Sequence, residues 1–178
     1  MAKETLARLR QRLGIFVDVQ NMFYSAKALH QSKIDYSKLL QEIVCNRDLV
    51  RAIAYVVHKP DADQSGFTDA LERLGYEIKT KELRLRPDGT AKGDWDMGIA
   101  IDTIAMAPKL DTVVLVTGDG DFEPLVEMLK AQGCRVEVVS FRKSTAIELI
   151  EASTQYTAIE ESLLFNNKKK KKPTKDAD

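Results

Sequence analysis

The chain has 178 residues with 27 basic and 27 acidic side chains, and so a formal net charge of zero. That total excludes a uniformly basic surface of the kind that binds nucleic acid nonspecifically, but it hides an uneven distribution. Residues 1–13 carry a charge of +3 and residues 168–178 carry +4, whereas residues 14–167 hold 17 basic and 24 acidic side chains, a net charge of −7. The body of the chain is therefore acidic and lies between two basic ends.

The acidic body has the size of one compact domain. With 44% hydrophobic residues it can bury a core, so we expect a single domain over residues 14–165. Two cysteines, Cys45 and Cys134, support neither a disulfide framework nor a thiolate zinc cluster, and they favour a reducing, cytoplasmic setting. The apolar runs fall short of the roughly 18 residues that cross a bilayer, and arginines interrupt residues 1–13. We therefore expect neither a membrane span nor a signal peptide.

Apolar segments rich in β-branched residues alternate with segments of helical periodicity. Before them, residues 1–13 have leucines at helical spacing and indicate a basic helix or extension. The pattern that follows predicts an α/β fold with a parallel sheet and helices on both faces. In chain order the strands are predicted at 14–19, 51–57, 76–86, 112–117 and 135–141, and the helices at 21–30, 36–45, 63–74, 96–107, 122–132 and 145–152.

Turn-forming residues agree with these boundaries. Gly75 and Gly133 each follow a predicted helix, where glycine commonly ends a helix before the next strand. The sequence Pro87-Asp88-Gly89 predicts a hairpin or loop after the third strand. Residues 166–178, with five consecutive lysines, are expected to be disordered.

Aspartates occur where a parallel sheet binds its ligands. Such sites lie outside the carboxyl ends of the strands, at the point where the strand order reverses. Asp18 is near the end of the first strand, with Asn21 three residues later, and Asp119 and Asp121 follow the fourth strand. In a sheet of order 3-2-1-4-5, the first and fourth strands are neighbours at the reversal. Their carboxylates would then converge in one crevice.

Two further aspartates, Asp94 and Asp96, stand at the start of the predicted helix 96–107. Two carboxylates ~4 Å apart repel by roughly 4 kcal/mol at an effective dielectric constant near 20, so a convergent group needs a cation. Oxygen ligands without cysteine or paired histidine favour Mg²⁺ or Mn²⁺ over zinc. Ions held in this way are common in phosphodiester hydrolysis.

Each of these residues also has a purely structural interpretation. Asp18 or Asp121 alone could be a helix N-cap or a turn former. Asp96 could be a first-turn acid that suits the helix dipole. Asp102 is a weaker candidate because it lies about a third of a turn from Asp96 around the helix. Three acidic sites at matched topological positions nevertheless favour a shared function.

Three motifs follow one another in the chain. The first is a strand ending in Asp with Asn three residues on, the second is a Lys-Gly pair before an acidic helix start and an apolar run ending in Asp, and the third is Ser/Thr-Gly-Asp-x-Asp-Phe. They stand here as Phe16-Val17-Asp18-Val19-Gln20-Asn21, as Lys92-Gly93-Asp94-Trp95-Asp96 through Asp102, and as Thr117 to Phe122. In the order and spacing of these motifs, residues 14–160 resemble the NYN domain, in the LabA-like branch of the PIN-like nuclease superfamily.

The resemblance implies a three-layer, PIN-like (Rossmann-like) fold with strand order 3-2-1-4-5 and a ribonuclease-like pocket that uses Mg²⁺ or Mn²⁺. One departure is the segment 153–156, which stands where related sequences often carry a further Asp, and this leaves a second metal site and catalytic competence open. Which of the two acids beside Trp95 points inward also stays open. By position, the metal-binding and catalytic carboxylates would be Asp18, Asp96 and Asp119, with Asn21, Asp94, Thr117 and Asp121 in supporting positions.

A nuclease also needs contacts to phosphate, and in an acidic body these must come from local cations. A basic rim at residues 79–92 could supply them through Lys81, Arg84 and Lys92, or it could equally be a solvated strand that charge protects from edge pairing. The aromatic side chains of Phe23, Tyr24 and Trp95 could stack an unpaired base or pack in the core. The lysine-rich tail could add RNA affinity or only solubility.

The sequence thus predicts a cytoplasmic, metal-dependent ribonuclease that acts on single-stranded RNA and is not bound to a membrane. The alternative is a catalytically weak or inactive module that binds RNA or a protein in regulation. A phospho-acceptor domain also clusters aspartates, but its acceptor Asp would end the third strand, where Arg84 and Arg86 stand here. A homo-oligomer remains open.

Overall fold

The computed structural model describes residues 10–58, 63–85 and 91–165. Most of the extension expected over residues 1–13 and all of the tail at 166–178 lie outside these ranges. Residues 10 and 11 precede the first strand, which begins at Arg12, two residues earlier than predicted. None of the helices in these ranges is long and apolar enough to span a membrane.

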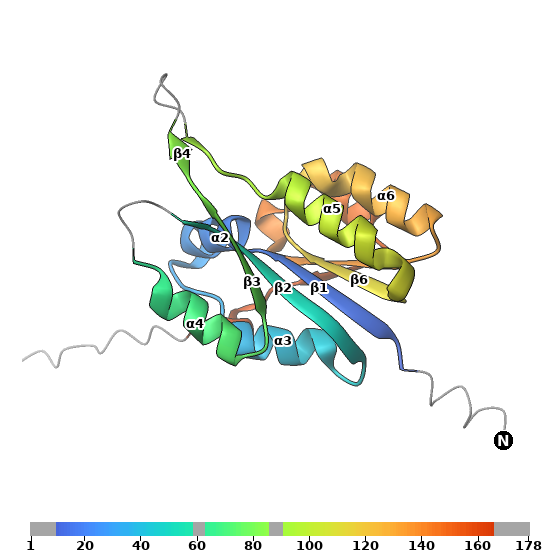
Figure 1. Cartoon of the computed structure of the whole chain (residues 1–178), viewed down its shortest axis with the longest axis horizontal. Helices are drawn as coiled ribbons and strands as arrows, with labels where there is room; N and C mark the ends of the chain where they lie inside the picture. Colours follow the sequence, from blue (N-terminus) through green and yellow to red (C-terminus); the bar gives the residue numbers. More distant parts are fainter. Residues whose placement is uncertain (1–9, 59–62, 86–90, 166–178) are drawn as a thin grey trace, which may run out of the picture.

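A six-stranded parallel sheet forms the centre of the molecule, in the order β3-β2-β1-β6-β7-β8 (Figure 1). Numbered along the chain within this sheet, β1, β2, β3, β6 and β7 have the predicted order 3-2-1-4-5. β8 adds a sixth strand at the edge beside β7. The strands are β1 (Arg12–Asp18), β2 (Asp48–His58), β3 (Glu77–Glu82), β6 (Thr112–Val116), β7 (Arg135–Ser140) and β8 (Gln155–Ala158).

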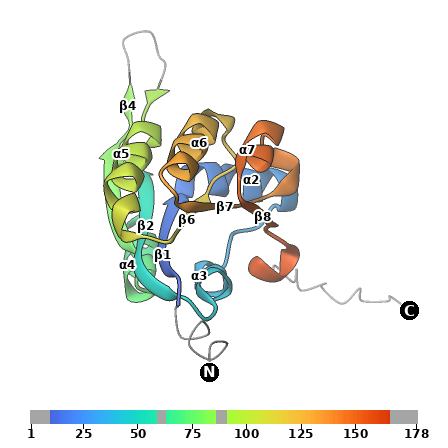
Figure 2. The same ribbon diagram turned by 90° about the vertical axis from the view of Figure 1, so that its right-hand side faces the viewer.

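Helices cover both faces of this sheet, as the alternation of segments predicted (Figure 2). On one face the core contains Ile15 and Val17, and on the other it contains Phe16, so the side chains of β1 are buried alternately in two cores. The first face is covered by α2 (Val19–His30), α3 (Tyr36–Val44) and α4 (Ser65–Arg73), and the second by α5 (Asp96–Met106), α6 (Glu123–Ala131) and α7 (Ile147–Ala152).

The third predicted strand divides into two elements. β3 runs along β2 to Glu82, and the amide of Leu83 still donates to the carbonyl of His58, the last residue of β2, at 2.8 Å. Within the described residues β2 offers no partner beyond His58, and the chain leaves the sheet after Leu83. β4 (Arg84–Leu85) then pairs antiparallel with β5 (Ala91–Lys92), as a hairpin requires, and the predicted turn Pro87-Asp88-Gly89 lies outside the described residues.

Helix ends follow the turn residues of the sequence. Gly75 and Gly133 have φ angles of 98° and 86°, in the left-handed region that favours glycine, just after α4 and α6. Short 3₁₀ turns follow α5 and three strands. They are η1 (Ala107–Lys109), η2 (Gly120–Phe122), η3 (Arg142–Ser144) and η4 (Glu161–Leu163).

Candidate metal centre

The candidate site lies at the carboxyl ends of β1 and β6, which are neighbours in the sheet. After β1 the chain enters α2 on one face, and after β6 it enters α6 on the other. The two connections diverge at this point, which is where open α/β sheets commonly bind their ligands. Asp18 is the last residue of β1, and Asp119 comes three residues after the end of β6.

Hydrogen bonds fix the end of β1 to the loop that follows β6. The carboxylate of Asp18 caps α2 by accepting from the amide of Asn21 at 3.0 Å, and its other oxygen lies 3.5 Å from the hydroxyl of Thr117. The side-chain oxygen of Asn21 in turn accepts from the amide of Gly118 at 3.0 Å. Asn21 and Thr117 therefore fix the position of the loop after β6 relative to the end of β1.

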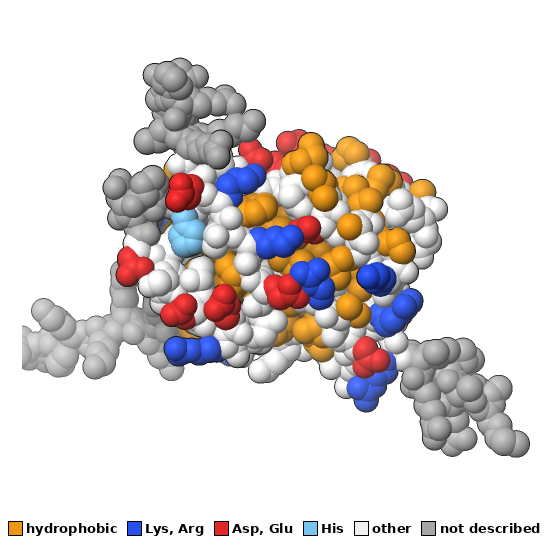
Figure 3. Space-filling view, in the orientation of Figure 1, with side chains coloured by type: hydrophobic (Ala, Val, Ile, Leu, Met, Phe, Trp, Pro, Cys, Tyr) orange, Lys and Arg blue, Asp and Glu red, His pale blue; other side chains and the backbone are white. Residues whose placement is uncertain are grey.

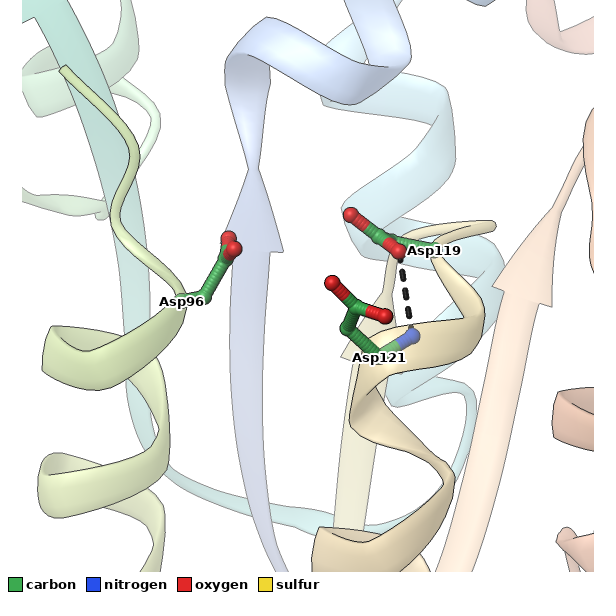
Figure 4. A group of neighbouring side chains, drawn as sticks. All are labelled: Asp96, Asp119 and Asp121. Carbon is green, nitrogen blue, oxygen red and sulfur yellow. Dashed lines mark hydrogen bonds between the residues drawn. The ribbon is translucent and has the colours of Figure 1, made fainter. Parts of the chain in front are cut away.

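The loop itself is tightly folded. The amide of Asp119 donates to the hydroxyl of Thr117 at 3.3 Å, and the amide of Asp121 donates to a carboxylate oxygen of Asp119 at 3.0 Å (Figure 4). A Cβ atom at Gly118 would come within 2.7 Å of the carbonyl of Ser144, and the amide of Ala146 binds the Gly118 carbonyl. Glycine is thus needed here for the close approach of two loops rather than for an unusual φ angle.

Three carboxylates converge across the end of β1. Asp96, Asp119 and Asp121 each offer one oxygen, and these oxygens all lie within 4.8 Å of one another. Figure 4 shows Asp96 extending from the start of α5 toward the two aspartates of the opposite loop. Asp94 is exposed and is not one of the three, so of the two acids beside Trp95 it is Asp96 that faces this group.

The local charge is strongly negative. Burial, with further contributions from Asp96 and Asp119, raises the pKa of Asp18 to about 6, although the hydrogen bonds from Asn21 and Thr117 oppose this. Burial also raises the pKa of Asp96, and the neighbouring charges that add to the shift are those of Asp94, Asp119 and Asp121.

This donor set fits a hard divalent cation. Its oxygens come from carboxylates, and the charges that raise the pKa of Asp18 and Asp96 are themselves carboxylates, so a bound cation would relieve the repulsion. Mg²⁺ and Mn²⁺ prefer such oxygen ligands. Of the predicted ligands Asp18, Asp96 and Asp119, the structure brings Asp96 and Asp119 together with Asp121, which was predicted in a supporting position. Asp18 is not one of these three, although the charges of Asp96 and Asp119 act on it.

Asp102 has a different environment from Asp96. The hydroxyl of Tyr55 donates to its carboxylate at 2.7 Å and the ammonium of Lys79 at 2.6 Å. Burial acts to raise the pKa of Asp102, but these two hydrogen bonds and the nearby positive charges outweigh it and bring the pKa below its usual value. Asp102 thus joins α5 to β2 and β3.

The predicted basic rim is only partly described. The ammonium of Lys81 donates to the carbonyl of Asp94 at 2.8 Å and lies 4.7 Å from the centre of the Trp95 ring, so it braces the segment that leads into α5. Arg84 and Lys92 face each other across the β4–β5 pair, but their side chains lie outside the described part of the structure.

The aromatic candidates separate into two groups. Trp95 packs against Tyr55, with ring centres 5.3 Å apart, and its indole nitrogen donates to the carbonyl of Val56. Phe23 and Tyr24 are instead 44% and 47% exposed on α2 and form an edge-to-face pair. Core packing thus accounts for Trp95, and the other two rings are accessible.

Two features of the site could not be read from the motifs. Ser153 and Thr154 lie at the amino end of β7, where the amide of Thr154 donates to the carbonyl of Val136, and Gln155 and Tyr156 begin β8. An acid at 153 or 154 would stand at the opposite end of the strands from the aspartates, whereas the hydroxyl of Tyr156 donates to the carbonyl of Ser140, at the carboxyl end of β7. The structure also places a further acid, Glu148 of α7, beside the loop. One of its carboxylate oxygens lies 2.9 Å from the position that a Cβ atom on Gly120 would occupy. No motif pointed to Glu148.

The fold and the aspartate group together define an α/β domain of nuclease-like type. Residues 12–160 match the NYN domain, and the chain belongs to this family. It is 36% identical over 166 residues to the Low amplitude and bright protein LabA of Synechococcus elongatus, covering 88% of each chain. A crystal structure of a protein of unknown function from Vibrio parahaemolyticus has the same fold, with a TM-score of 0.82 and 36% identity over 88% of this chain and 97% of that one.

Proposed function

We propose that this protein is a divalent-cation-dependent ribonuclease that hydrolyses phosphodiester bonds of single-stranded RNA. The observation that carries the proposal is the convergence of Asp96, Asp119 and Asp121 near Asp18, at the strand-order reversal of an NYN-family fold. A bound Mg²⁺ or Mn²⁺ ion would supply Lewis-acid chemistry, polarising the phosphodiester and acidifying water.

The side chains of the site have distinct tasks in this proposal. Asp96, Asp119 and Asp121 hold the cation, and Asp18 adds negative charge near Asp96 and Asp119 and caps α2. Asn21 and Thr117 keep the two loops in position, so that the carboxylates need little reorganisation on binding. Asp94, exposed at the entrance to α5, adds to the negative potential at Asp96.

RNA binding would use groups around this acidic centre. The hairpin that carries Arg84 and Lys92 follows Lys81, whose ammonium contacts the backbone of Asp94 beside the site. Basic side chains there could bind backbone phosphates without reading the bases. The exposed rings of Phe23 and Tyr24 lie two and three residues after Asn21 and could stack an unpaired base, which favours single-stranded RNA as the substrate.

The test is cleavage of end-labelled single-stranded RNA by the purified protein with Mn²⁺ or Mg²⁺, compared with EDTA. Asp119→Asn is expected to lower the rate by roughly 100-fold or more, because it removes a charge that acts in the transition state. Asp69→Asn, at an exposed position on α4, is the matched control and should leave the rate unchanged.

Binding of the same RNA should be measured separately by fluorescence anisotropy. RNA that is retained but not cleaved with either ion would overturn the enzymatic proposal in favour of a noncatalytic RNA-binding module. Cleavage that persists unchanged in Asp119→Asn would mean that the activity does not come from this site.

A further inference from the structure

Helix α5 presents an apolar face to solvent as well as to the core. Its inner face buries Ile99, Thr103 and Met106. On the outer face, Met97 is 71% exposed, Ile101 58% and Ile104 38%. Their spacing of four and then three residues aligns them in one stripe along the helix.

A further exposed apolar side chain lies on the neighbouring helix. α6 lies beside α5 on the same face of the sheet (Figures 1 and 2), and its Met128 is 36% exposed. Hydrophobic side chains gather over this part of the molecule in Figure 3. No segment within residues 10–58, 63–85 and 91–165 covers them. An exposed apolar stripe such as that on α5 usually marks a protein interface.

The stripe is complementary to itself when two copies are antiparallel. If a twofold axis passes at Ile101, Met97 of one copy faces Ala105 of the other, and Ile101 faces its own equivalent. The exposed Asp94 precedes α5 and the exposed Lys109 ends the 3₁₀ turn η1 that follows it, seven and eight residues from Ile101 on opposite sides. Antiparallel pairing therefore places opposite charges together at both ends.

We infer that the protein forms a homodimer in which α5 packs antiparallel against α5 of a second copy, about a twofold axis at Ile101. A parallel arrangement would set Asp94 against Asp94 and Lys109 against Lys109. The pairing of Asp94 with Lys109 at both ends of the apolar stripe assigns the outer face of α5 to a second copy of this chain. The inference is independent of the proposed nuclease activity, because it uses the outer face of α5 and not the aspartates that converge at its start.

The first test is sedimentation equilibrium of the full chain over a micromolar to millimolar concentration series. The wild type is expected to dimerise, and Ile101→Glu should raise the dissociation constant by roughly 30-fold or more, because it buries two like charges at the centre of the interface. Ile147→Glu changes an isoleucine that is 70% exposed on α7 and is the matched control. Circular dichroism spectra of both variants would show that they are folded.

Charge reversal tests the register. Lys109→Glu should weaken dimerisation, and adding Asp94→Lys to it should restore the wild-type affinity, because the pair would then attract again with reversed sign. A monomeric wild type over the whole series would overturn the inference. A dimer that Ile101→Glu leaves intact would overturn it as well, and weakening by Lys109→Glu without rescue would overturn the antiparallel register.

A symmetric crosslink gives an independent readout. In a Cys45→Ser background, which removes the exposed native thiol, Ile101→Cys should form an intermolecular disulfide on mild oxidation, because each residue 101 meets its equivalent. Ile147→Cys in the same background should not. Equal crosslinking of both variants would mean random collision and would count against the twofold axis at Ile101.

Discussion

At Asp18, metal binding and the stability of the cation-free fold favour different charge states of the carboxyl group. Its burial and the nearby charges of Asp96 and Asp119 raise the pKa of its carboxyl group to about 6. The ionised form that a cation would require therefore destabilises the cation-free fold at neutral pH. Asparagine at this position would keep an oxygen that accepts from the amide of Asn21 and would lose the charge.

We therefore expect Asp18→Asn to increase the free energy of unfolding in EDTA at pH 8, on the order of 2 kcal/mol. The folded-state pKa is raised, so the penalty on the wild type is complete above about pH 6 and disappears as the pH falls toward the unfolded value near 4. Urea denaturation between pH 8 and pH 4 would show the two proteins converging in acid. A difference that is constant with pH would contradict this account.

The close approach at Gly118 leads to a second residue-scale prediction. Gly118→Ala would bring a Cβ within 2.7 Å of the Ser144 carbonyl, a backbone atom that cannot rotate away. We expect a loss of about 1–3 kcal/mol in the free energy of unfolding. The control is Gly66→Ala in α4, where a Cβ meets nothing within 4 Å and alanine should stabilise the helix by up to about 1 kcal/mol. Urea denaturation of both variants measures the two effects, and equal shifts would refute the steric argument.

At the scale of single elements, α5 must be held in place because it carries Asp96. Asp102 lies six residues along the same helix and receives hydrogen bonds from Tyr55 of β2 and Lys79 of β3. These contacts join the helix to the sheet at a point away from the cation site. These hydrogen bonds should therefore set the position of Asp96 without contacting a bound cation.

Tyr55→Phe removes one of these bonds and keeps the buried ring. We expect a loss of about 1–2 kcal/mol in stability together with weaker Mn²⁺ binding, measured by calorimetric titration. Tyr76→Phe is the matched control, because the Tyr76 hydroxyl donates to the carbonyl of Tyr36, on the other face of the sheet. It should lose similar stability with unchanged Mn²⁺ affinity. Equal loss of affinity in both variants would indicate a merely general loosening of the fold.

Elements differed in how far the sequence could predict them. The central strands were predictable because their apolar residues are buried on both faces, as Phe16 and Val17 are. β8 has only four residues and lies at an edge, so it left no such pattern. The division of the third strand at Leu83 depends on where β2 ends, which is a property of the pairing and not of the local sequence.

The candidate site was predictable to a similar extent. Strand-end acids such as Asp18 and Asp119 can be located from topology. The choice of Asp96 over Asp94 depends on the residue at which α5 begins, and the nearness of Asp121 depends on a tight turn of the loop. The environment of Asp102 could not be foreseen, because its partners come from two strands distant in the sequence.

At the scale of the whole molecule, binding of a cation should stabilise the native state. An ion that binds only the folded protein adds about 2.7 kcal/mol when its concentration is 100 times the dissociation constant. We expect the melting temperature to rise on titration with Mn²⁺ or Mg²⁺ and to fall again with EDTA. Differential scanning calorimetry of the wild type and of Asp119→Asn measures this, with Asp69→Asn as the control. A rise of equal size in Asp119→Asn would place the ion elsewhere.

The pairing of β1 with β6 has a consequence for the time at which the protein can become active. In this pairing Val17 lies beside Val116, so residues about 100 positions apart must meet before Asp18 and Asp119 come together. Such long-range pairing is slow compared with the formation of local helices. A growing chain on the ribosome could not assemble the candidate metal site until β6 and the loop after it had emerged. On the proposed function, nuclease activity would therefore begin only after this part of the chain had been made.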